Sequence, residues 1–69
     1  MFLKNKFLAY LKEHNISIEQ IAKLLGISKT TLYRKINGES DFFRSEIQKL
    51  TELIPKEIVL EIFFSEKVA

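Results

Sequence analysis

Apolar residues recur at intervals of three and four along most of this 69-residue chain. That spacing gathers side chains on one face of an α-helix, whereas a strand would alternate them. In the first segment it predicts a helix over Phe2–His14, with an apolar face formed by Leu3, Phe7, Leu8 and Leu11. Lysines occupy several of the remaining positions, as expected for a helix with one solvated side.

The central stretch, Ser17–Gly38, predicts two short helices joined by a tight turn. Ser17 is an N-cap candidate, and Gln20 three residues later completes the pattern of a capping box. The apolar face of the first helix is formed by Ile21, Ala22 and Leu25. Gly26 follows directly, where a helix end often needs a left-handed residue. We therefore expect the first helix to end there.

The second helix of the pair is predicted to begin after Ser28 and to end at Asn37-Gly38. Leu32 and Ile36 form its apolar stripe. Its other positions carry no acid and consist of Lys29, Thr30, Thr31, Tyr33, Arg34 and Lys35. A purely structural helix hairpin could share these apolar spacings, but a solvated helix normally mixes charges of both signs.

The remaining chain predicts a fourth helix over about 42–54 and an apolar element over 55–64, which begins at Pro55. Within 58–64 only Glu61 is not apolar, so these side chains cannot all face one side of a helix. One interpretation is a dimerisation surface formed by Val59, Ile62, Phe63 and Phe64. The alternative is deep burial between the first and fourth helices, with extended chain from Ile62 to Phe64.

Ala22, Gly26-Ile27 and Leu32 together resemble the helix-turn-helix of Cro- and C1-type (XRE-like) phage repressors. The ending from Ile62 through Ser65-Glu66-Lys67-Val68 is similar to that of small phage and prophage regulators. The resemblance implies an all-α, lambda-repressor-like bundle of about five short helices, forming a single domain over 1–69 with its motif at 17–38. Two positions depart from the family pattern: Ile18 replaces a frequent Gln, and Lys35 stands where the last apolar anchor is usual, which suggests a slightly rotated or extended second helix.

In such repressors the second helix of the motif lies in the DNA major groove. The resemblance implies base contacts from four residues, namely Lys29, Thr30, Tyr33 and Arg34. It implies contacts to the DNA backbone from six others, namely Ser28, Thr31, Lys35, Asn37, Ser40 and Arg44. Glu39 and Asp41 would be repelled by phosphate, and this repulsion would limit the contact between the DNA backbone and the loop that follows the second helix. Arg44 has an alternative role as the ion-pair partner of Asp41 or Glu46.

The distribution of charge supports a polyanionic partner. Residues 1–38 carry seven cations and two acids, a net charge of +5, whereas residues 39–69 carry four cations and seven acids, a net charge of −3. The basic half is also the half that contains the motif.

Composition argues against several other classes. The chain has no Cys and one His, so neither a disulfide framework nor a zinc site is expected, and no metal, cofactor or small-molecule ligand is implied. There is no glycine-rich phosphate loop, and we do not expect an enzyme. No apolar run approaches a membrane span, and no secretion signal is recognisable, so we expect a cytoplasmic protein.

The sequence therefore predicts a regulator that binds double-stranded DNA sequence-specifically, in the manner of a phage or mobile-element repressor. A homodimer on a pseudo-palindromic operator is expected. Two alternatives stay open: a protein-interaction module of antirepressor or antitoxin type, and an accessory factor for DNA excision or integration.

Overall fold

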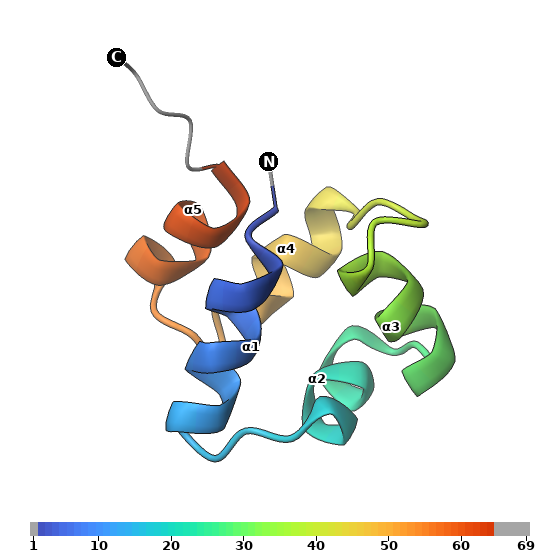
Figure 1. Ribbon diagram of the computed structural model, residues 1–69, viewed down its shortest axis with the longest axis horizontal. Helices are drawn as coiled ribbons and strands as arrows, with labels where there is room; N and C mark the ends of the chain where they lie inside the picture. Colours follow the sequence, from blue (N-terminus) through green and yellow to red (C-terminus); the bar gives the residue numbers. More distant parts are fainter. Residues whose placement is uncertain (1, 65–69) are drawn as a thin grey trace.

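The computed structural model describes residues 2–64, which form five helices. These are α1 (Lys4–Glu13), α2 (Ile18–Leu25), α3 (Lys29–Ile36), α4 (Arg44–Leu50) and α5 (Lys56–Phe64). The described part of the chain contains no strand, which confirms the predicted all-α bundle. In Figure 1, α1 lies in the middle of the molecule, with α5 on one side and the pair α2–α3 on the other.

The predicted caps are present at both helices of the central pair. The hydroxyl of Ser17 accepts a hydrogen bond from the backbone N–H of Gln20 at 3.0 Å, and the Gln20 side-chain oxygen accepts from the Ser17 N–H at 2.8 Å. The Ser28 hydroxyl accepts from the Thr31 N–H at 3.1 Å. Gly26 ends α2 in the left-handed conformation, with φ of 74°. These local interactions confirm the predicted helix, tight turn and helix.

Helix α4 is shorter than the predicted range of 42–54. It begins after Phe43 and ends at Leu50, and residues 51–54 form a turn. The Thr51 hydroxyl donates to the Gln48 carbonyl at 2.6 Å, which satisfies one of the last carbonyl groups of the helix. Pro55 disfavours helical backbone at the residue before it, so the chain leaves the helix before α5 begins.

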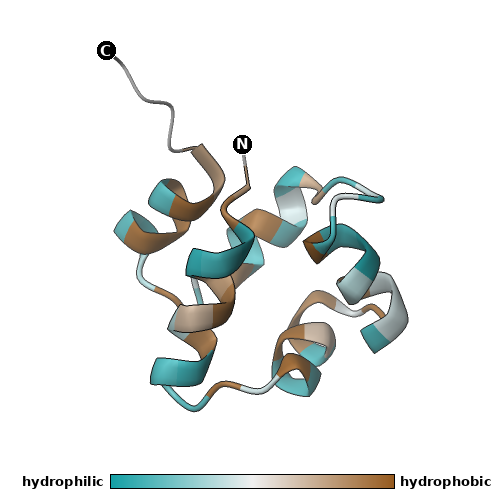
Figure 2. Cartoon of the chain, in the orientation of Figure 1, coloured by the Kyte–Doolittle hydropathy of each residue, from teal (hydrophilic) through white to brown (hydrophobic). Residues whose placement is uncertain are grey.

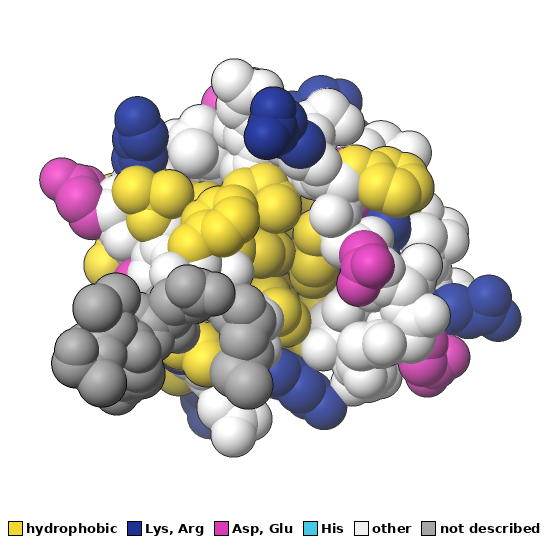
Figure 3. Space-filling view, turned by 90° about the horizontal axis from the view of Figure 1, so that it is seen from above, with side chains coloured by type: hydrophobic (Ala, Val, Ile, Leu, Met, Phe, Trp, Pro, Cys, Tyr) yellow, Lys and Arg dark blue, Asp and Glu magenta, His cyan; other side chains and the backbone are white. Residues whose placement is uncertain are grey.

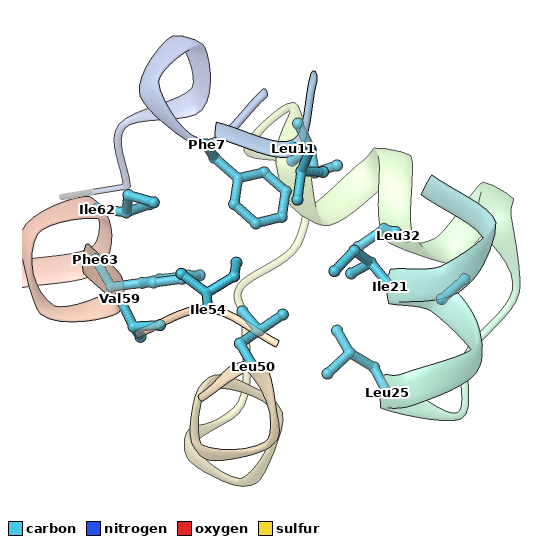
Figure 4. Packing of buried hydrophobic residues seen from close by; sticks show 12 residues of the cluster. Phe7, Leu11, Ile21, Leu25, Leu32, Leu50, Ile54, Val59, Ile62 and Phe63 are labelled. Carbon is cyan, nitrogen blue, oxygen red and sulfur yellow. The ribbon is translucent and has the colours of Figure 1, made fainter. Parts of the chain in front are cut away.

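A single core joins the five helices. Phe7 and Leu11 of α1 point between α5 on one side and α2–α3 on the other, above Leu50 and Ile54 (Figure 4). The buried hydrophobic residues are Phe7, Leu11, Ile21, Ala22, Leu25, Leu32, Ile36, Leu50, Ile54, Val59, Ile62 and Phe63. The apolar stripes predicted for the two helices of the central pair thus meet Phe7 and Leu11 of the first predicted stripe in one cluster.

The C-terminal element is helical through Phe64, and most of its apolar residues belong to this core. Val59, Ile62 and Phe63 are 2%, 0% and 7% exposed, so the prediction that they form a dimerisation surface is wrong. They are buried because α5 packs on α1, and because the Ile62 carbonyl accepts a hydrogen bond from the Leu3 N–H at 2.8 Å. Only Phe64 of the four predicted residues is exposed.

The alternative interpretation, burial within the bundle, is therefore correct, although the chain from Ile62 to Phe64 is helical and not extended. Of the ending that resembles phage regulators, residues 65–68 lie outside the described residues. Among the described residues no helix is both long and apolar enough to cross a membrane.

Candidate nucleic-acid interface

The turn between α2 and α3 is closed by backbone hydrogen bonds. The Gly26 N–H donates to the Lys23 carbonyl at 3.2 Å, and the Ile27 N–H donates to the Ala22 carbonyl at 3.0 Å. Ala22 is 4% exposed, and its small side chain lies in the core that α2 shares with α3 and α4. Leu32 of α3 is completely buried in the same core. One face of α3 is therefore packed against the core, and the opposite face is accessible to solvent or to a binding partner.

The exposed face of α3 carries the residues predicted to contact bases. Lys29, Thr30, Tyr33 and Arg34 are all exposed, and Tyr33 retains 45% of its accessible surface. Figure 2 shows this helix mainly in hydrophilic and neutral colours. The structure thus brings these four residues together on one accessible surface.

Two hydroxyl groups at the start of α3 are engaged within the cap. The Ser28 hydroxyl donates to Thr31 Oγ1 at 3.0 Å while it accepts from the Thr31 backbone. Beside them, the Lys29 ammonium lies 3.5 Å from a Glu19 carboxylate oxygen of α2. Both side chains are at least half exposed, so this ion pair is weak and exchangeable with water or phosphate.

The connection from α3 to α4 carries a second set of exposed polar residues. Asn37, Ser40 and Arg44 are exposed, as a contact to the DNA backbone requires. The carboxylates of Asp41 and Glu46 form no ion pair with Arg44 in the described chain, so the alternative role of Arg44 is not observed.

Lys4 also lies at this surface, although it is not among the residues predicted to contact DNA. Its ammonium donates to Asn37 Oδ1 at 2.8 Å, across 33 positions of the chain. Helix α1 thus places a cation beside the C-terminal end of α3. Lys4 could have been identified from the sequence only if the packing of the start of α1 against the end of α3 had been predicted first.

Lys35 is the one residue of the predicted interface that the structure removes from it. Its side chain is buried, and its ammonium lies 3.2 Å from the Glu46 carboxylate and donates to the Asp41 carbonyl at 2.9 Å. Phosphate cannot reach an ammonium group in this position, so the prediction that Lys35 contacts the DNA backbone is wrong. The physical reason is the path of the chain after α3, because the connection and the first turn of α4 cover this position and supply both polar partners of the ammonium group.

The remaining side chains suit recognition of a DNA duplex. Lysine and arginine donate to guanine O6 and N7, and threonine both hydrogen-bonds to bases and contacts the thymine methyl group. An α-helix fits the width of the major groove. The exposed acids Glu39 and Asp41 lie on the connection after α3, where they would restrict the approach of phosphate.

Comparison with known proteins supports this geometry. A family model described as the helix-turn-helix domain of resolvase matches residues 8–39, a range that includes α2, the turn and α3. The matched family is not the Cro- and C1-type family that the motif resembles. No curated protein and no solved structure matches the chain significantly. Taken together with the fold and the exposed face of α3, the family match shows that this chain contains a helix-turn-helix DNA-binding domain.

Proposed function

We propose that the protein is a sequence-specific transcriptional regulator that places α3 in the major groove and occupies an operator as a repressor. The observation that carries the proposal is the exposed face of α3, where Lys29, Thr30, Tyr33 and Arg34 are accessible and no acid interrupts residues 28–37. The role needs no catalytic group, cofactor or small-molecule ligand, and the protein acts inside the cell, where its DNA is.

Base reading by α3 is tested by selecting bound duplexes from a random library at near-physiological salt. Enrichment of one sequence motif supports the proposal, and enrichment of none refutes it. On the selected duplex, Arg34→Ala should weaken binding by about 1–3 kcal/mol and relax the preference at one base position. Arg44→Ala is the matched control, because loss of a phosphate contact weakens binding equally on all sequences.

We further propose that two copies associate through the groove between α4 and α5. This groove has a volume of about 450 Å³, and its accessible apolar lining is formed by the partly buried Phe42 and Ile47 and the exposed Leu60 and Phe64. Leu60 and Phe64 are 45% and 57% exposed, although both are large and apolar. Figure 3 shows hydrophobic side chains gathered across the middle of the face seen from above. A second copy would remove this surface from water.

The dimer is tested by sedimentation equilibrium of the wild type and of Leu60→Glu. We expect a dimeric wild type and a monomeric variant. Leu53→Glu is the matched control, because Leu53 is similarly exposed, at 40%, but lies outside this groove. A two-fold symmetric motif in the selected duplexes, with half-sites about 10 base pairs apart, would agree with the dimer. A monomeric wild type, or enrichment of single half-sites, refutes it.

The family match favours a second candidate function, as an accessory factor in DNA excision or integration, because the matched helix-turn-helix is that of resolvase. The two functions differ in their effect on DNA. A repressor bound over a promoter blocks transcription in a purified system. An accessory factor would instead bend its site, which circular-permutation gel mobility detects. Bending without repression would favour the second candidate.

A third candidate, a protein-interaction module, predicts a different result from both. Capture of a protein partner that survives nuclease and high salt, together with no enriched duplex, would support it.

A further inference from the structure

A buried ion pair connects α3 to α4. Lys35 in the last turn of α3 is 4% exposed, and Glu46 in the first turn of α4 is 6% exposed. Their charged atoms are 3.2 Å apart. They are the only charged residues buried among residues 2–64, and they lie beside the surface that would face DNA.

Each partner also holds the connection between the two helices. The Lys35 ammonium donates to the Asp41 carbonyl at 2.9 Å and lies 4.0 Å from the centre of the Phe43 ring. The same Glu46 oxygen that faces Lys35 accepts the Phe43 N–H at 2.8 Å. One ammonium and one carboxylate therefore fix the end of α3, the connection and the start of α4.

Stability alone is a weak reason for such a pair. Removing two charges from water is costly, and replacing a buried ion pair by well-packed hydrophobic residues of similar volume is often neutral or stabilising. Hydrogen bonds are directional, however, and they fix the relative orientation of two segments, which apolar contacts alone do not. The contacts of Lys35 and Glu46 define how the last turn of α3 sits against the connection, and Arg34 is the neighbour of Lys35 in that turn.

We propose that Lys35 and Glu46 are positioning residues for DNA recognition, which hold α3 and the connection to α4 in one arrangement without touching DNA. The inference rests on the proposed reading of bases by α3. Loss of the pair loosens the last turn of α3. The preference of Arg34 for one base then decreases more than its electrostatic attraction to phosphate.

The test variant is Lys35→Met/Glu46→Gln, which removes both charges. Gln at position 46 retains a carbonyl oxygen that can accept from the Phe43 N–H, so the cap of α4 is kept. The matched control is Lys6→Met/Glu61→Gln, which removes the exposed ion pair between α1 and α5, whose charged atoms are 2.9 Å apart.

Two readouts separate positioning from stability. The first is the ratio of affinities for the selected duplex and for a scrambled duplex of equal length. We expect this ratio to fall about tenfold in the test variant while the variant still unfolds in a single cooperative urea transition, as a folded domain does. The control variant should leave the ratio unchanged. An unchanged ratio in the test variant would overturn the proposal.

The second readout needs no DNA. Amide hydrogen exchange over residues 36–43 should be about tenfold faster in the folded test variant, with exchange in the core unchanged. If the wild type selects no duplex, the proposed function fails, whereas this measurement still decides whether the pair fixes the connection. Equal exchange in the wild type and the test variant would overturn the positioning role. If this double variant does not fold, Lys35→Leu/Glu46→Gln, which also leaves no unpaired charge buried, carries both expectations.

Discussion

Gly26 offers a sharp test of the turn on which the DNA-binding motif depends. Its φ of 74° lies in the left-handed region, and an added Cβ would meet no atom within 4 Å. Gly26→Ala should therefore destabilise the fold through backbone conformation alone. For a residue other than glycine that conformation costs roughly 1–2 kcal/mol. Alanine also restricts the unfolded chain, which offsets about 0.4–1 kcal/mol of this cost.

The expected net loss in the free energy of unfolding is therefore about 1 kcal/mol, which corresponds to a decrease in Tm of roughly 4–8 °C for a domain of this size. Urea unfolding followed by circular dichroism measures it directly. Gly26→Asn is the matched control, because Asn tolerates the left-handed region. Asn15 already adopts it in this chain, with φ of 57°.

Two results would refute this reasoning. A neutral or stabilising Gly26→Ala would show that the turn relaxes to a right-handed conformation without cost. A loss above about 3 kcal/mol would exceed the conformational cost and would require a steric clash that the open space around the Cβ position excludes.

The other predictions concern caps, surface charge and the core. Ser17→Ala and Ser28→Ala should each lower the free energy of unfolding by about 1 kcal/mol, and equal stability of either variant and the wild type in urea would contradict the capping role. Glu19→Gln should tighten binding to the selected duplex, most at low salt, because it releases Lys29 and removes a negative charge beside α3; weaker binding would show that Glu19 holds Lys29 in its reading position. Ile62→Ala should destabilise the fold by about 2–5 kcal/mol, since its side chain is fully buried, and the loss should not depend on protein concentration. A loss of stability seen only at high protein concentration would instead indicate that Ile62 lies in a dimer interface.

Local sequence signals predicted the central motif well because they act between neighbouring residues. The capping box of Ser17 and Gln20, the left-handed Gly26 and the cap at Ser28 each involve residues at most three positions apart. Helix α4 was predicted too long for a related reason. Apolar periodicity continues through Ile54, whereas the chain leaves the helix after Leu50.

The predictions that were wrong depend on contacts between different helices or between residues far apart in the chain. Burial of Lys35 depends on Glu46 and on the path of the connection, neither of which helical periodicity within α3 predicts. The apolar surplus of α5 is absorbed because the segment before α1 packs against it, as the aromatic contact between Phe2 and Phe63 at 4.9 Å illustrates. Composition shows that an apolar face must be covered, but it does not show which segment covers it.

The same long-range pairing changes the meaning of the charge asymmetry. Lys6 and Lys35, two cations of the basic half, pair with Glu61 and Glu46 of the acidic half, so the net +5 of residues 1–38 overstates the positive surface near α3. Lys29 faces Glu19 and contributes less than a free lysine.

The cations that remain at the proposed interface are few, and this limits how strongly salt can act on binding. Lys4, Arg34 and Arg44 are exposed and form no ion pair within the described chain. If each neutralises about one phosphate, a dimer should lose affinity with a slope of log K against log salt near −5, and a single subunit with a slope near −3. A slope near −10 would require phosphate contacts from residues other than these three. A slope near zero would exclude all three, and sequence reading by α3 would then have no phosphate contacts to fix its register on the duplex.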